Sequence, residues 1–284
     1  MLLDVLSYGF MQKALIAGIS VAIICSFMGT FLVLRRYALF GDGIAHVAFG
    51  GISVGLFLGV APLWSAFVVS VLGGLGLQKL RSSTKISGDA AVAVILVSGL
   101  AVGVTLVSAS GGFSVDLFSF LFGSILLISL EDTITIIGIS AGIVVMLLVF
   151  QKQFLHISFN EEQAKVAGLN VTMLNYLFVV IAAVTVVTSM RLVGILLISA
   201  LIVIPNLSAM LFGKGFKKTI VISVSMSVVS VVVGIFLSYY LNLAPSGMIV
   251  LIAVALLLGT LACRSLGLIS KINIQEPSKI SHNA

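Results

Sequence analysis

FMQKALIAGISVAIICSFMGTFLVL, at residues 10–34, contains a single charged side chain, Lys13. A run of about 20 apolar residues is long enough to cross the hydrocarbon core of a bilayer as one helix. The whole chain shares this character, with 60% hydrophobic residues, 8% charged residues and a mean hydropathy of +1.30 over 284 residues. Such a composition excludes a soluble globular domain and predicts an all-α polytopic membrane protein.

Further apolar runs of similar length predict the other spans. We expect about nine transmembrane helices, at residues 10–34, 40–59, 62–79, 89–109, 132–150, 174–190, 192–212, 219–241 and 246–263. The stretch from Phe113 to Leu130 is interrupted by polar residues and fits a re-entrant or interfacial segment as well as a span, so the count is eight to ten. The chain then comprises one transmembrane domain, 1–265, and a polar tail, 266–284, which we expect to be disordered and cytoplasmic.

The basic residues indicate the orientation of the chain in the membrane. With the N-terminus outside and the C-terminus cytoplasmic, all but two of the fifteen lysine and arginine residues face the cytoplasm, the exceptions being Lys13 and Arg191. The net charge of +6 is explained by these loops, which lie beside anionic lipid headgroups, so no nucleic-acid partner is needed. We therefore expect a multi-pass protein of a prokaryotic inner or plasma membrane.

A second stretch, LVLRRYALFGDGIAHVAFGG at residues 32–51, carries the candidate site. Asp42 and His46 lie four residues apart, which places them on one face of a helix within an otherwise apolar chain. An ionisable residue at membrane depth is unfavourable by about 2.5–3.5 kcal/mol unless a partner or a function compensates. Two simpler interpretations stay open: Asp42 caps the helix, and His46 bonds a backbone carbonyl.

An imidazole and a carboxylate are suitable ligands for a divalent transition metal. Both bind zinc, manganese and ferrous iron, and intrinsic affinity favours zinc. Two ligands per chain are too few for a tight resident site, but they suit an ion in transit. We therefore expect no permanently bound cofactor. A twofold axis that brought together two copies of the pair would supply four ligands.

The longest hydrophilic interior segment, QKQFLHISFNEEQAKVAGLNVTMLNY at residues 151–176, falls on the predicted cytoplasmic side. Ser158 or Asn160 can cap a short helix through EEQAKVA, and Gly168 can end it. A short helix parallel to the membrane could dock into a soluble partner and transmit its motion. An ordinary connecting loop with a helical turn is the alternative.

Acidic residues on the predicted outer side are weaker candidates. Asp116, Glu131 and Asp132 could attract a cation or a docking protein, but solvated surface charges are the more common case. Arg191 is placed to pair with one of these acids or to contact an external protein.

Three motifs in order, FLVLRRYALFGDGIAHVAFGGI, NEEQAKVAGLNV and RLVGILLISALIVIPNLSA, resemble the membrane permease of metal-ion ABC transporters, which import zinc, manganese or iron. The resemblance covers residues 8–263. It implies a homodimer in the membrane that binds two cytoplasmic ATP-binding subunits and receives metal from an extracellular solute-binding protein. It also implies that Asp42 and His46 contact the metal, and that Glu161, Glu162, Ala164 and Gly168 couple the permease to the ATPase.

The chain departs from the family pattern at two positions. Ala45 stands where many relatives have a serine before the histidine, and Asn206 stands where small residues usually follow the proline. Neither change affects the proposed ligands, but residues around a site tune its metal preference. The choice of metal therefore stays open.

Enzymatic functions find little support in the sequence. The chain has no GxxxxGK[ST] phosphate-binding loop and no HExxH motif, so ATP hydrolysis is expected only from a partner subunit. The alternative to an ATP-driven permease is a stand-alone secondary metal transporter or channel, which predicts paired broken helices in inverted repeats.

Overall fold

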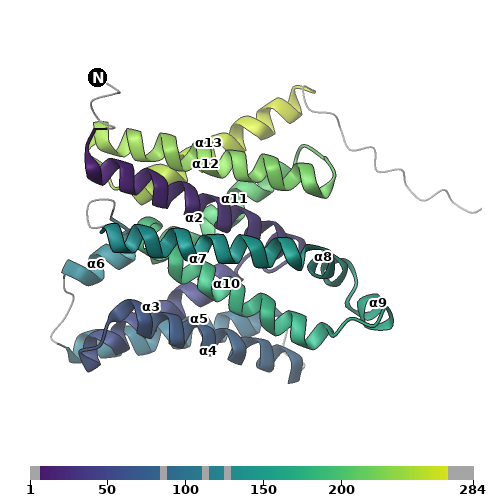
Figure 1. The fold of residues 1–284 in the computed structure, drawn as a ribbon, viewed down its shortest axis with the longest axis horizontal. Coiled ribbons are helices and arrows are strands. Elements are labelled where there is room, and N and C mark those ends of the chain that lie inside the picture. The colour runs from purple at the N-terminus through teal and green to yellow at the C-terminus, as the bar shows by residue number, and fades with distance from the viewer. Residues whose placement is uncertain (1–6, 84–87, 111–114, 125–128, 268–284) are drawn as a thin grey trace, which may run out of the picture.

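The computed structural model describes residues 7–83, 88–110, 115–124 and 129–267, and every regular element in them is a helix (Figure 1). The helices are α2 (Gly9–Leu34), α3 (Phe40–Leu58), α4 (Pro62–Ser83), α5 (Gly88–Ala109), α6 (Val115–Phe122), α7 (Leu130–Val149), α8 (Gln151–Phe159), α9 (Glu161–Val166), α10 (Val171–Val193), the 3-10 turn η1 (Ile195–Leu197), α11 (Ile198–Met210), α12 (Phe216–Leu241) and α13 (Pro245–Ser265). The all-α prediction is confirmed.

Eight of the described helices are long and apolar enough to cross a membrane. They correspond to eight of the nine predicted spans. The ninth, predicted at residues 192–212, is instead the 13-residue helix α11, preceded by η1. The prediction of nine full-length spans is therefore wrong in this one place, while the range of eight to ten holds.

Gly194 explains why the predicted span at 192–212 is broken. Its backbone has φ +80° and ψ 153°, a region that is essentially restricted to glycine, and this conformation ends α10 at Val193. Pro205, the proline within the predicted span, lies inside α11, and the helix continues through it to Met210. The boundary between α10 and α11 is therefore set by Gly194 and not by the proline.

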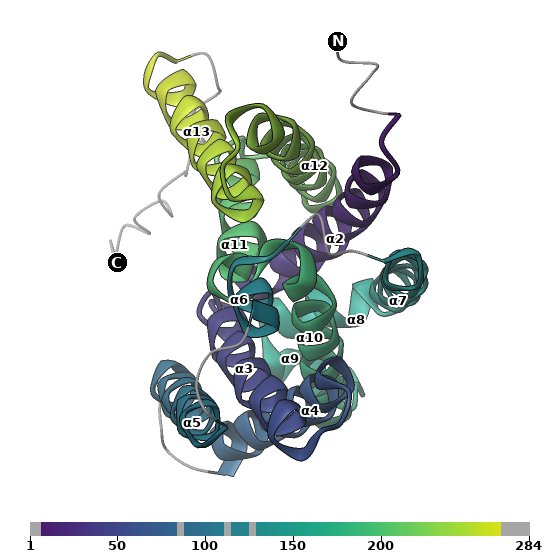
Figure 2. The same cartoon turned by 90° about the vertical axis from the view of Figure 1, so that its left-hand side faces the viewer.

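Three helices form the buried centre of the bundle. α2, α3 and α10 are the most buried of the long helices, whereas at most about a third of the residues of α4, α5, α7, α12 and α13 are buried. Viewed end on, α10 and α11 lie near the middle and α5, α7 and α13 lie at the edge (Figure 2). The peripheral helices expose large apolar side chains such as Leu72, Val97 and Leu251, as expected for surfaces that contact lipid.

α3 and α5 approach each other closely because glycines face glycines. A Cβ atom added to Gly50 would lie 2.9 Å from the carbonyl oxygen of Gly99, and one added to Gly99 would lie 2.8 Å from that of His46. Small residues permit such contact between helix backbones in membranes. The close approach fixes the position of α3, which carries the candidate site.

The interrupted stretch between Phe113 and Leu130 contains one described helix, α6, of eight residues. A helix of this length cannot cross a bilayer, which agrees with a re-entrant or interfacial segment rather than a span. Residues 111–114 and 125–128, together with most of the tail predicted to be disordered, 268–284, lie outside the described residues.

The ends of the described chain lie at opposite ends of the bundle. α2 begins at one end in Figure 1, and α13 finishes at the other, which is the end that carries α8 and α9. A chain whose two ends lie at opposite ends of a bundle must cross it an odd number of times. The number is odd here when η1 and α11 together are taken as one crossing in addition to the eight long helices. The orientation relative to the membrane stays a prediction.

Candidate functional site

Asp42 lies in the first turn of α3, which begins at Phe40. The N-cap residue of this helix is Leu39, which makes no side-chain cap hydrogen bond, so the alternative interpretation of Asp42 as the N-cap is wrong. The reason is that α3 already begins at Phe40, whereas an N-cap at Asp42 would place the start of the helix at Gly43. A carboxylate in the first turn is still stabilised by the positive end of the helix dipole.

His46 follows one helical turn later and is half-buried, like Asp42. Its Nδ1 atom is buried and has no hydrogen-bond partner in the described part of the chain, although most buried polar atoms are hydrogen-bonded. The Asp42 carboxylate is the one charged group whose electrostatic effect on the ring is resolved. A nitrogen in this situation is available to a ligand.

The neighbours of α3 show which way this pair faces. Gly41 lies against Ser199 and Ile202 of α11, while Gly43 lies against Val92 of α5. Because successive helical residues are about 100° apart, Asp42 faces the gap between α11 and α5. No group of three or more histidine, cysteine, aspartate or glutamate side chains that could hold a metal occurs among the described residues. Asp42 and His46 are therefore at most a pair of candidate ligands within one chain.

The predicted helix in the hydrophilic segment is present as α9. The Asn160 side chain accepts hydrogen bonds from the backbone N–H groups of Glu162 and Gln163, at 3.0 and 3.1 Å, which confirms Asn160 as the cap. Gly168 adopts φ +81° and ends the helix, as expected. The structure adds a second short helix, α8, directly before it, and Ser158 lies within α8 rather than at a cap.

The four residues proposed for coupling do not share one environment. Ala164 is buried and Glu161 is half-buried, whereas Glu162 and Gly168 are exposed. The surface of the segment also carries large apolar side chains, since Phe159, Met173 and Val166 are 75%, 65% and 90% exposed. One side of α9 thus packs against the bundle, and the exposed apolar side chains come from its last residue, Val166, and from the adjoining ends of α8 and α10.

Arg35, at the C-cap of α2, is a residue that the sequence reasoning counted only as a basic loop residue. Its side chain contacts α8 and α10, and burial lowers its pKa to about 10, against the opposing effect of the Glu161 carboxylate. The guanidinium stays protonated at neutral pH. The two consecutive arginines after an apolar span were the signal available in the sequence. The contacts of Arg35 join residues far apart in the chain, so spacing alone could not predict them.

Asn206, noted as a departure from the family pattern, is fully buried and fully hydrogen-bonded. Its Oδ1 accepts from the hydroxyls of Thr30 and Ser223 at 2.6 and 2.7 Å, and its Nδ2 donates to the backbone carbonyls of Ser26 and Ile202 at 3.0 and 2.7 Å. The side chain therefore ties α11 to α2 and α12. All of its hydrogen-bonding capacity is used within the chain.

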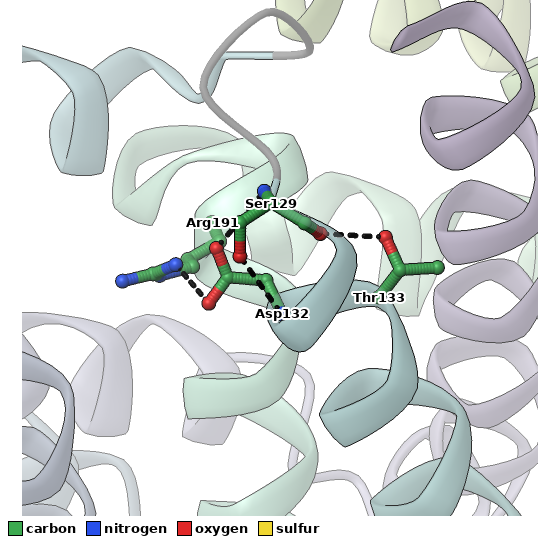
Figure 3. A network of polar contacts seen from close by, with 4 residues as sticks. All are labelled: Ser129, Asp132, Thr133 and Arg191. Carbon is green, nitrogen blue, oxygen red and sulfur yellow. Dashed lines mark hydrogen bonds and ion pairs between the residues drawn. The ribbon is translucent and has the colours of Figure 1, made fainter. Parts of the chain in front are cut away.

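At the end of the bundle opposite α9, Arg191 pairs with Asp132 (Figure 3). This pair confirms that the arginine interacts with one of the predicted outer acids. Asp132 and Ser129 also form a reciprocal capping box at the start of α7. Glu131 is exposed. The side chain of Asp116 lies outside the described residues. Asp132 is thus part of the structure of this end rather than a free cation ligand.

Known proteins resemble this chain over most of its length. A "Probable metal transport system membrane protein" of Treponema pallidum is 35% identical over 92% of this chain and 98% of its own length. The "Manganese transport system membrane protein MntC" of Listeria innocua is 31% identical over 87% of this chain and 88% of its own. A solved structure, "PsaBC from Streptococcus pneumoniae in complex with Fab", matches with a TM-score of 0.82 and 32% identity, covering 92% of this chain and 95% of that one.

The model of the ABC 3 transport family matches residues 7–264, which include every described helix except the last residue of α13. A permease of this kind is a multi-pass membrane subunit without an ATPase domain, and it works with ATP-binding and solute-binding partners. The matched residues, the relatives and the helical bundle agree on one assignment. The chain belongs to the ABC 3 transport family and is the membrane permease of a prokaryotic ABC importer of metal ions.

Proposed function

We propose that the transported ion passes Asp42 and His46, and that zinc is bound there more tightly than manganese or ferrous iron. The buried and unpartnered Nδ1 of His46 carries this proposal, because a neutral imidazole nitrogen beside a carboxylate is a suitable donor set for a divalent metal. Intrinsic affinities for such donors increase from manganese through iron to zinc. The substrate is thus bound by two side chains from one turn of α3.

Manganese is the second candidate, because the Listeria relative is named for manganese transport and is 31% identical to this chain. Oxygen-rich sites suit manganese, and a site with one carboxylate and one imidazole per chain does not exclude it. The residues around the two ligands then decide which ion is released fastest.

A second copy of the chain completes the site in this proposal. Two side chains occupy only two of the four coordination positions of a four-coordinate ion. Both side chains face the gap between α5 and α11. A twofold homodimer would place an identical pair opposite the first. In this arrangement the ion binds between the two permeases and is released when they separate.

We also propose that α9 lies on the cytoplasmic side and docks into the ATP-binding subunit. Support comes from the exposed apolar side chains of Phe159, Val166 and Met173, which would be unfavourable in water without a partner. Ala164 and Glu161 hold the helix to the bundle, while Glu162 and Gly168 lie on the exposed side. The C-terminal end of α13 shares this cytoplasmic side, and α2 begins outside.

Uptake measurements test the function as a whole. Cells that lack their own importers are given this permease with its ATP-binding and solute-binding subunits, and radiolabelled zinc and manganese are supplied separately. We expect accumulation to require all three proteins and zinc to compete more strongly than manganese. Accumulation that continued with an ATP-binding subunit unable to hydrolyse ATP would contradict the ATP-driven mechanism and favour a secondary transporter.

Replacing Phe159 and Val166 together by alanine is expected to weaken docking of the ATP-binding subunit by tenfold or more. Burial of such side chains contributes about 1.5–3 kcal/mol each, and part of that is lost on truncation. The measurement is the amount of ATP-binding subunit that co-purifies with the permease. Leu243→Ala, at another exposed apolar residue at the opposite end of the bundle, is the control. Equal recovery from both variants would contradict the proposed docking surface.

A further inference from the structure

The guanidinium of Arg35 joins the end of α2 to the helices around α9. Its Nε donates to the Ser158 hydroxyl of α8 at 3.1 Å, and its Nη1 donates to Oδ1 of Asn175 in α10 at 2.9 Å. The face of the guanidinium lies over the Phe178 ring, 4.0 Å from its centroid. Only a planar group with several donors makes these three contacts at once, which distinguishes arginine from lysine.

Asn175 continues this connection to α9. Its Nδ2 donates to Oε1 of Glu161 at 3.1 Å, while its Oδ1 accepts from Arg35. The amide thus lies between the cation of α2 and the first carboxylate of α9. The amide oxygen of Asn175 can only accept, as it does from Arg35, and its NH2 group can only donate, as it does to Glu161. The side chain therefore has one orientation that satisfies both neighbours.

The other end of the connection is the short turn that precedes the metal-site helix. Arg35 is the first residue after α2, and α3 begins at Phe40, two residues before Asp42. Backbone hydrogen bonds from Tyr37 to Leu32 and from Phe40 to Tyr37, at 2.8 and 3.0 Å, hold this turn together. A displacement of Arg35 is therefore passed to the first turn of α3.

A second arginine supports the same turn from α4. The Arg81 guanidinium lies 4.2 Å from the centroid of the Tyr37 ring, and the Glu161 carboxylate acts on both Arg81 and Arg35. The carboxylate at the start of α9 thus faces two cations that hold opposite sides of the turn. Movement of α9 changes both interactions together.

The arrangement is not optimised for stability. The Nη2 atom of Arg35 is buried and has no hydrogen-bond partner within the described chain. Leaving a buried donor of a charged group unpaired is unfavourable, and well-packed apolar residues often replace buried charges without loss. Retaining the charge here favours a role in movement over a role in packing.

We propose that Arg35 is the positioning residue through which motion of α9 reaches Asp42 and His46. This inference rests on the proposed function, in which α9 docks the ATP-binding subunit. When that subunit moves α9, Glu161 displaces Asn175 and Arg35, and the turn at residues 35–39 changes the orientation of the first turn of α3. The metal ligands then move with the nucleotide cycle without contacting the ATP-binding subunit.

The test measures coupling in the purified transporter, reconstituted in lipid nanodiscs with its ATP-binding subunit. ATP hydrolysis is recorded with and without metal-loaded solute-binding protein, and uptake is recorded in cells. Arg35→Lys is expected to assemble and to keep its basal hydrolysis, but to lose about tenfold of the metal-dependent stimulation. Arg36→Gln, an exposed neighbour in the same turn, is the control and should keep its stimulation.

Asn175→Asp gives a second and sharper variant. It keeps an acceptor for Arg35, so the fold should be retained, but it replaces the donor to Glu161 with a like charge. We expect stimulation to be lost, and the added Glu161→Gln change to restore much of it, because an amide at position 161 can donate to the new carboxylate. A purely structural role would change assembly and basal hydrolysis together with the stimulation, whereas a coupling role changes the stimulation alone.

The possible outcomes separate this inference from the proposed function. Full stimulation in both Arg35→Lys and Asn175→Asp would overturn the role of Arg35, and so would a parallel loss of assembly and basal hydrolysis without rescue. Loss of stimulation with retained assembly, and its rescue by Glu161→Gln, would support it. If the wild-type complex itself showed no metal-dependent hydrolysis and no uptake, the proposed function would fail instead.

Discussion

His46→Ala and Asp42→Asn are each expected to abolish most metal uptake while the permease still assembles with its ATP-binding subunit. Loss of a group that merely supports a metal ligand lowers affinity or activity by about 10–100-fold, so loss of a ligand should have at least this effect. His46→Ala removes the unpartnered nitrogen, and Asp42→Asn keeps the size of the side chain but removes its charge. Radiolabelled uptake at equal membrane levels of each variant is the measurement.

Two matched controls separate a ligand effect from a general one. His156 is an exposed histidine in α8, and Asp89 lies in the first turn of α5 as Asp42 lies in that of α3. His156→Ala and Asp89→Asn should therefore leave uptake unchanged. If Asp42→Asn and His46→Ala also retained uptake, the ion would follow another path, and the pair would have a structural role only.

Gly194→Ala is expected to cause a large loss of stability. The backbone of Gly194 lies at φ +80° and ψ 153°, where a side chain adds strain of about 1–3 kcal/mol. A Cβ atom would also lie 2.5 Å from the carbonyl oxygen of Leu121 and 2.6 Å from the backbone nitrogen of Gly123. Backbone atoms on both sides of the contact leave little room for adjustment, so part of the α6 contact with η1 must be lost.

The consequence can be measured as the thermal midpoint of the purified permease in detergent and its yield in the membrane. Gly142→Ala, within α7, is the control, because a Cβ atom there has nothing within 4 Å and alanine favours the helix. We expect a clear fall in the midpoint for Gly194→Ala and no fall for Gly142→Ala. Equal midpoints would show that the break between α10 and α11 does not depend on this backbone conformation.

Hydropathy and capping patterns predicted most of the fold because they depend on local sequence. Runs of apolar residues located the eight long helices, and the Asn160 and Gly168 signals placed α9 between the correct residues. The break before α11 was missed, because a glycine in an apolar run gives no sign of its backbone angles until its neighbours are known. The predicted span at 40–59 begins at the first residue of α3, but the sequence left Asp42 open as the N-cap, because Leu39 provides no capping signal.

The candidate site was predictable only in part. The spacing of Asp42 and His46 was enough to place them on one face of a helix. Their ionisable side chains within an apolar run identified them as candidates. The environment of the pair depends on α5 and α11, which lie far away in the sequence. The same holds for Arg35, whose partners Ser158 and Asn175 are more than one hundred residues away. Contacts of this kind arise from the packing of the whole bundle.

The pairing of Asp132 with Arg191 also bears on how fast metal can be captured. Electrostatic steering of a free cation needs uncompensated negative charge at the mouth of the pathway. The Asp132 carboxylate is neutralised by its arginine, and Glu131 is exposed beside it. Asp132 therefore contributes little to the attraction of dilute ions from bulk water, which agrees with a permease that receives its metal from a solute-binding partner.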